Sequence, residues 1–115
     1  MQRDPRAYLW DMREAAAAIA TFTSGLDQGA YEANPLVQSA VERKFEIIGE
    51  AAGPLVKYHP ELGTRLPEYR QIIAFRNLLI HGYAAVEHRR VWAVVHQVLP
   101  GLEAALEALL KDAGA

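Results

Sequence analysis

Apolar residues recur at three- and four-residue steps in four segments of this chain, and that spacing places them on one face of an α-helix. The first segment starts at Asp4-Pro5, where an acidic capping residue precedes a proline, and it ends at Gly25. We expect a helix there of about five turns, and then a loop at Asp27–Gly29. The apolar stripe of this helix consists of Tyr8, Met12, Ala15, Ile19 and Phe22.

The second segment repeats the same start signal at Asn34-Pro35. Its apolar stripe consists of Val37, Val41, Phe45, Ile48 and Ala52. Another face carries Glu42, Glu46 and Glu50, which could suggest a metal site, but no histidine or aspartate joins them. We therefore interpret this row as a solvated or partner-facing surface. Gly53-Pro54 is expected to kink or end the helix, and residues 55–66 to form a frayed continuation and then a connector.

The third segment starts near Pro67 and ends at His81-Gly82, and a short turn is predicted at Ala84–Glu87. The fourth has a wide apolar face, and Pro100 is expected to kink or split it. That face consists of Val91, Val95, Val98, Leu102, Ala105 and Leu109, widened by Trp92, Val94 and Leu99. Since the sequence has no strand pattern, it predicts an all-α fold, an up-and-down bundle of four or five helices in one domain, residues 1–115.

Composition adds the expectation of a second buried surface. Hydrophobic residues make up 51% of the 115 residues, which is rich for so small a unit and suggests a dimer interface. The chain has no cysteine and its histidines are scattered, so we predict no metal site and no cofactor. No apolar run approaches the ~20 residues of a membrane span, and residues 1–5 lack the apolar run of a signal peptide. We therefore expect a cytoplasmic protein.

Charge draws attention to one part of the chain. The net charge of −2 argues against a protein that coats nucleic acid non-specifically. Residues 57–90, however, hold six basic residues against three acidic ones, whereas the remainder holds six against eleven. This basic third contains the chain's most reactive cluster, residues 76–83, which read Arg-Asn-Leu-Leu-Ile-His-Gly-Tyr.

The side chains of residues 76–83 suit work on a phosphate group. Arg76 can hold a phosphate by two parallel hydrogen bonds, and the imidazole of His81 can take or give a proton. Tyr83 supplies a hydroxyl that can form a hydrogen bond or be modified. Gly82, the residue before it, lets the chain turn out of a helix. The segment therefore predicts a phosphate-directed site.

Helical geometry limits how this site can form. Arg76 and His81 are five residues apart, so on one straight helix their side chains point about 140° apart. Two solutions are open. Either Gly82 unwinds the last turn and brings His81 round, or a second copy of the chain completes the site across a dimer interface.

The spacing of Arg76, His81 and Tyr83 is also that of a known signature, an arginine, four residues, a histidine, one residue and a tyrosine. In this spacing the chain resembles the HEPN domains of the HepT toxin family. Flanking segments agree in the same order: Ala40-Val41-Glu42, Ile48-Gly49-Glu50-Ala51, Asn77, Val91-Trp92 and Leu99-Pro100. Two positions depart from the family's pattern, which commonly has aspartate in place of Glu87 and often tryptophan in place of Glu68; both concern local structure.

The resemblance implies an all-α homodimer in which two motifs face a shared cleft. It implies a metal-independent ribonuclease toxin with Arg76 and His81 as catalytic residues and Asn77 in support, orienting His81 or bonding the phosphate. It also implies a partner of the HepT/MntA kind, a minimal nucleotidyltransferase antitoxin that uses ATP to attach AMP to Tyr83.

Three functions are open to this motif, and the resemblance favours the first. As an endoribonuclease, the chain would use the RNA 2′-OH as nucleophile, with histidine moving protons and arginine stabilising charge, and would leave a 2′,3′-cyclic phosphate. As a non-catalytic nucleotide- or partner-binding subunit of a nucleotidyltransferase complex, it would use the same residues only to hold a phosphate. As a structural dimer, it would pair Arg76 with Glu42, Glu46 or Glu50, and His81 would only cap a helix.

Overall fold

The structure is the helical bundle that the sequence predicted. The computed structural model describes residues 3–114, so Met1, Gln2 and Ala115 lie outside the described residues. Residues 3–114 form seven α-helices and one 3-10 helix, with no strand among them. The elements are α1 (Pro5–Thr23), α2 (Gln28–Glu32), α3 (Pro35–Tyr58), α4 (Pro60–Gly63), α5 (Tyr69–His81), η1 (Tyr83–Ala85), α6 (His88–Gln97) and α7 (Leu99–Asp112).

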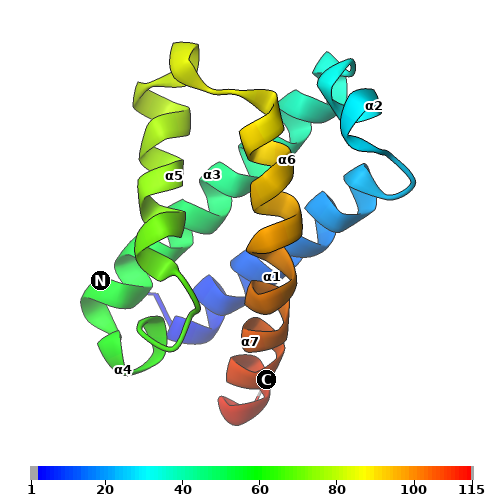
Figure 1. Cartoon of the computed structure of the whole chain (residues 1–115). Coiled ribbons are helices and arrows are strands. Elements are labelled where there is room, and N and C mark those ends of the chain that lie inside the picture. Colours follow the sequence, from blue (N-terminus) through cyan, green and yellow to red (C-terminus); the bar gives the residue numbers. More distant parts are fainter. Residues whose placement is uncertain (1–2, 115) are drawn as a thin grey trace.

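The helix α3 lies at the centre of the bundle. It packs against α1, its most extensive partner, and against α5. The helix α7 packs on α1, and α6 packs against α2. The helices α5 and α6 run in opposite directions and are joined at one end of the molecule by the segment that contains η1 (Figure 1). The five longer helices form the predicted bundle, and α2 and α4 are short additions to it.

The two helix starts predicted from a capping residue followed by proline are confirmed by their capping bonds. The carboxylate of Asp4 accepts a hydrogen bond from the amide of Arg6 at 2.9 Å, and the side chain of Asn34 accepts one from the amide of Val37 at 3.1 Å. The guanidinium of Arg6 also donates to Asp4, and this bonding lowers the pKa of the Asp4 carboxyl to about 2.

A short helix, α2, replaces most of the loop predicted at Asp27–Gly29. The carboxylate of Asp27 accepts a hydrogen bond from the amide of Ala30 at 2.8 Å and so caps the start of α2. Tyr31 is fully buried, and its ring lies 5.3 Å from the ring of Trp92 on α6. A helix this short has no apolar period to read, so its existence depends on the burial of Tyr31.

The core follows most of the predicted stripes, although Val37 and Ala105 are only partly buried, and it departs from them most clearly at the end of α1. Phe22, which was expected to join the core, is exposed, and Thr23 is buried in its place. Thr23 follows Ile19 by four residues and therefore lies on the same face of α1. The hydroxyl of Thr23 donates a hydrogen bond to the carbonyl oxygen of Ile19 at 2.9 Å, so the helix satisfies this buried polar group internally.

The helix α3 does not end at Gly53-Pro54 but continues to Tyr58. Proline has no N–H to donate to the carbonyl of Glu50, so one backbone hydrogen bond of the helix is missing. Leu55, directly after the proline, is fully buried. Its packing stabilises the helix beyond the proline. The frayed continuation and connector predicted at residues 55–66 are therefore the last turn of α3, which is regular, and a segment that contains α4.

The fourth predicted helix is split, as Pro100 indicated. The helices α6 and α7 meet at Val98 with a bend of 44°. The wide apolar face at residues 91–99 is largely used by the chain's own core, since Val91, Val95, Val98 and Leu99 are buried. Within residues 3–114 no single helix is long and apolar enough to cross a membrane; only α6 and α7 taken together have that length and composition.

Candidate functional site

The helix α5 carries Arg76 and His81 and stays regular to its end. The amide of Gly82 donates to the carbonyl oxygen of Leu78 at 2.8 Å, which is the ordinary helical bond of the last turn. Gly82 has φ −121°, so it does not take the left-handed conformation. Of the two solutions left open by the sequence, the unwinding of the last turn is therefore wrong, and Arg76 and His81 point about 140° apart on one helix.

Gly82 instead lies close to the preceding turn of α5. A Cβ at this position would lie 3.0 Å from Cδ1 and 3.3 Å from the carbonyl oxygen of Leu78. Both distances are shorter than an ordinary carbon contact. Because Gly82 has no side chain, the chain can leave α5 close to the last helical turn. Tyr83, the next residue, is the first of η1, which stands where a simple turn was predicted at Ala84–Glu87.

Arg76 lies between α5 and α3 with its charged end partly open to solvent. Its Nη1 donates a hydrogen bond to Oδ1 of Asn77 at 3.1 Å, and its Nη2 lies 3.9 Å from Oε1 of Glu50. Its Nε is buried and has no hydrogen-bond partner in the described part of the chain. The side chain retains 29% of its exposure, so its outer nitrogens remain accessible to a ligand.

A cavity of about 260 Å³ opens beside the guanidinium, between α3 and α5. Arg76, Asn77 and Glu50 give it polar walls, and Gly49 and Gly53 leave the backbone of α3 bare along it. A guanidinium and an amide in such a recess can donate several hydrogen bonds to one anionic group. The recess is therefore suited to a phosphate.

His81 and Tyr83 lie outside this cavity, on the surface. His81 is exposed as the last residue of α5. Tyr83 is 76% exposed, the second most exposed large apolar or aromatic side chain described, after Leu36. No hydrogen bond or ion pair between residues 3–114 joins either of them to Arg76. One copy of the chain thus has a recess beside Arg76 and a separate exposed imidazole.

Comparison with known proteins supports the resemblance. The profile of the family described as "Ribonuclease HepT-like" matches residues 12–109. The chain belongs to the HepT-like ribonuclease family. It is 33% identical over 111 residues to the protein named "Probable ribonuclease HepT" of Thermococcus cleftensis, an alignment that covers 96% of this chain and 100% of the relative. It is 30% identical over 106 residues to a "Putative RNase" of Methanocaldococcus jannaschii, covering 92% and 96%. No solved structure matches significantly.

Two groups that the sequence left apart come together beside the HepT-like motif. Nδ1 of His88, in the first turn of α6, lies 3.8 Å from Oε2 of Glu42 on α3. Burial raises the pKa of the Glu42 carboxyl, while the charge of His88 lowers it and that of Glu46 raises it. The pair links the segment after Tyr83 to α3. Sequence spacing could not reveal it, because the two residues lie on different helices.

The row formed by Glu42, Glu46 and Glu50 does not become a metal centre among the described residues. Within residues 3–114 no group of three or more histidine, cysteine, aspartate or glutamate side chains is placed to hold a metal ion. Glu50 lies 3.7 Å from Nη1 of Arg43 as well as near Arg76, and Glu42 lies near His88. Two of the three carboxylates, those of Glu42 and Glu50, therefore lie near basic side chains on α3, α5 and α6.

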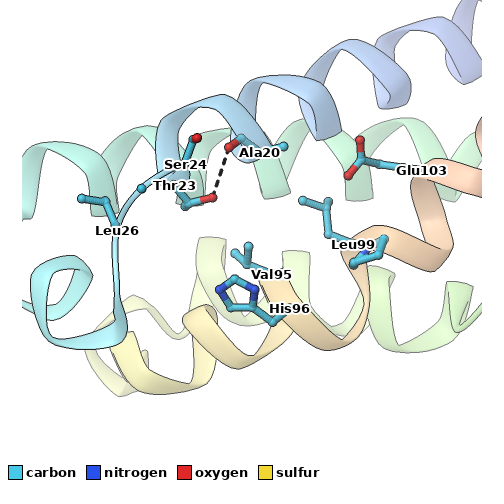
Figure 2. Close-up of a pocket in the computed structure, with 10 residues that line it drawn as sticks. Ala20, Thr23, Ser24, Leu26, Val95, His96, Leu99 and Glu103 are labelled. Atoms are coloured by element: carbon cyan, nitrogen blue, oxygen red, sulfur yellow. Dashed lines mark hydrogen bonds between the residues drawn. The ribbon is translucent and has the colours of Figure 1, made fainter.

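A second cavity, of about 330 Å³, lies where the end of α1 meets the junction of α6 and α7. Figure 2 shows His96 and Val95 of α6 facing Thr23 and Ser24 across it, with Glu103 at one side. None of the motif residues lines it. It is therefore separate from the recess beside Arg76.

Proposed function

We propose that this HepT-like chain is an endoribonuclease whose active site is formed by Arg76 and His81 of two copies across a dimer interface. The regular end of α5 supports this most directly. Because the helix is not unwound, the guanidinium and the imidazole of one copy diverge by about 140°. A second copy related by a two-fold axis would bring two of each side chain to one cleft.

The RNA supplies the nucleophile, and this chain supplies the groups that move protons and stabilise charge. The 2′-oxygen of the ribose bonds to the adjacent phosphorus while the bond from phosphorus to the 5′-oxygen of the next nucleotide breaks. One His81 takes the proton from the 2′-OH, and the other gives a proton to the leaving oxygen. Arg76 stabilises the charge that develops on the phosphate. The products are a 2′,3′-cyclic phosphate and a free 5′-hydroxyl, and no metal takes part.

Asn77 supports the site by holding Arg76. Its Oδ1 accepts the 3.1 Å hydrogen bond from Nη1, which leaves the other face of the guanidinium for the phosphate. The sequence had suggested that Asn77 orients His81 or bonds the phosphate. The bond to Arg76 favours a role in orienting the arginine.

The exposure of Tyr83 favours control by modification. We infer that the chain is the toxin of a toxin–antitoxin pair in the cytoplasm and that a nucleotidyltransferase antitoxin attaches AMP to the Tyr83 hydroxyl. With 76% of the residue exposed, an enzyme can reach the hydroxyl without unfolding the chain. The added phosphate would compete for Arg76 and repel an incoming RNA.

The contact between Arg76 and Glu50 gives only weak support to a purely structural role for Arg76. A purely structural arginine would be held by that carboxylate, but at 3.9 Å and with the glutamate side chain 42% exposed the contact is loose. Ion pairs of this kind contribute about 0–1 kcal/mol.

A non-catalytic phosphate-binding subunit remains the second candidate, because the recess could bind a nucleotide without His81.

Cleavage of a defined RNA by Arg76→Ala and His81→Ala tests the proposal. Each variant should stay folded and lose about 10²-fold or more in rate, since charge stabilisation or general acid–base catalysis is lost. Arg89→Ala and His96→Ala are matched controls, because both side chains are exposed and lie outside the recess. Wild-type cleavage should leave 2′,3′-cyclic phosphate ends and survive EDTA. Full activity in a folded His81→Ala protein, or rescue of a chelated protein by a divalent ion, would refute the mechanism.

A further inference from the structure

Gly49 of α3 leaves no room for a side chain. A Cβ built on it would overlap the Cβ of Arg76 and would lie 2.6 Å from its Cγ. Non-bonded carbon atoms pack at about 3.5–4.0 Å. The atoms met are the stem of the arginine next to the backbone of α5, not the mobile end of a side chain. Any side chain at position 49 must therefore displace the Arg76 stem or the whole of α5.

The other glycines inside long helices do not share this property. A Cβ on Gly53, one turn later in α3, or on Gly101 in α7 would meet nothing within 4 Å. Glycine disfavours a helix relative to alanine. At Gly49 that disadvantage is offset by a close contact between helices that only glycine permits.

We infer that Gly49 is a positioning residue for Arg76. With its stem on the bare backbone of α3, the arginine has its Nε buried and its Nη1 and Nη2 directed to Asn77 and Glu50 at the rim of the recess. Gly49 thus determines where the guanidinium can meet a phosphate, although it presents no side chain of its own to the substrate. This inference rests on the proposed function for its effect on cleavage, but not for its effect on Arg76.

Cleavage kinetics of Gly49→Ala test the catalytic consequence. Displacing a catalytic group by about 1 Å costs about 10²-fold in rate, and we expect that loss in kcat more than in KM. Gly101→Ala is the matched control, since it makes the same change in a helix remote from the site, and its rate should equal that of the wild type. In an Arg76→Gly background, Gly49→Ala should lower the residual rate less than about 2-fold, because the Cβ and Cγ that the new methyl group would meet are both gone.

Nitrogen-15 NMR of the Arg76 Nε–H gives a readout that needs no RNA. The signal is assigned by its absence in Arg76→Lys. Because Nε is buried, we expect slow exchange of this proton with solvent in the wild type and in Gly101→Ala, and much faster exchange in Gly49→Ala. Circular dichroism at the assay temperature confirms folding. If Gly49→Ala alone melts, the Gly49→Ala/Gly101→Ala protein, with the better helix former at both positions, is measured in its place.

The two readouts separate the inference from the proposed function. A rate loss and faster Nε–H exchange confined to Gly49→Ala would support the positioning role. Wild-type kcat in Gly49→Ala, an equal loss in Gly101→Ala, or unchanged Nε–H exchange would overturn it. If the wild-type chain cleaves no RNA, the proposed function fails, while the exchange measurement still decides whether Gly49 positions Arg76.

Discussion

The amide of Gln38 provides a sharp test of how the α2–α3 corner is held. Gln38 lies in α3, is 6% exposed, and donates from Nε2 to the carbonyl oxygens of Tyr31 at 2.9 Å and Glu32 at 3.0 Å. These carbonyls belong to the last turn of α2, where the oxygen of Tyr31 also accepts a hydrogen bond from the amide of Asn34 at 3.1 Å. The change Gln38→Glu keeps the shape of the side chain but places a carboxylate against two carbonyl oxygens.

The expected cost follows from those two bonds. Each hydrogen bond contributes about 1 kcal/mol, and a buried polar group left without a partner costs about 1–3 kcal/mol more. We therefore expect Gln38→Glu to lower the free energy of unfolding by about 3 kcal/mol or more at pH 7. For a chain of this size that corresponds to a fall in Tm of roughly 10 °C. Gln38→Met, which removes both bonds without adding charge, should cost about 2 kcal/mol.

The dependence on pH distinguishes the charge from the lost bonds. Burial against carbonyl oxygens raises the folded-state pKa of the introduced carboxyl above its unfolded value, so the stability of Gln38→Glu falls as the pH rises through the folded pKa. Below the unfolded pKa the carboxyl is protonated and can donate one hydrogen bond. Urea unfolding at pH 4 and pH 7, relative to wild type and Gln38→Met, measures this. The reasoning would be refuted if Gln38→Glu lost the same unfolding free energy at both pH values. It would also be refuted if the unfolding free energy of this variant at pH 7 lay within 0.5 kcal/mol of wild type.

Three further predictions concern the surface beside the motif. Since burial raises the pKa of Glu42, its ionised form is disfavoured by folding, and Glu42→Gln should gain in unfolding free energy over wild type as the pH rises from 4 to 7; a constant difference would contradict this. Incubation with the cognate nucleotidyltransferase, ATP and magnesium should add AMP to the peptide with Tyr83 and inactivate the chain, but not in Tyr83→Phe; an adduct that leaves cleavage intact would count against it. Sedimentation at micromolar concentration should show a dimer, and a folded monomer would argue against the shared site.

Much of the fold could be predicted because its signals are local. Capping at Asp4 and Asn34, the apolar period of each long helix and the break before Pro100 all depend on residues within a few positions of one another, and the structure confirms them. The residue types of the segment that contains Arg76 and His81 likewise predicted a phosphate-directed site. The chain's resemblance to the HepT family followed from the residue types and spacing of this segment together with flanking segments that occur in the same order along the chain.

Tertiary structure decided what no local pattern contains. It formed α2 by burying Tyr31 against Trp92, and it continued α3 past Pro54 by burying Leu55. In the same way it brought His88 to Glu42 and placed the stem of Arg76 on Gly49. Each of these depends on packing between separate helices, where burial outweighs local preference, and a one-dimensional sequence does not state which helix faces meet.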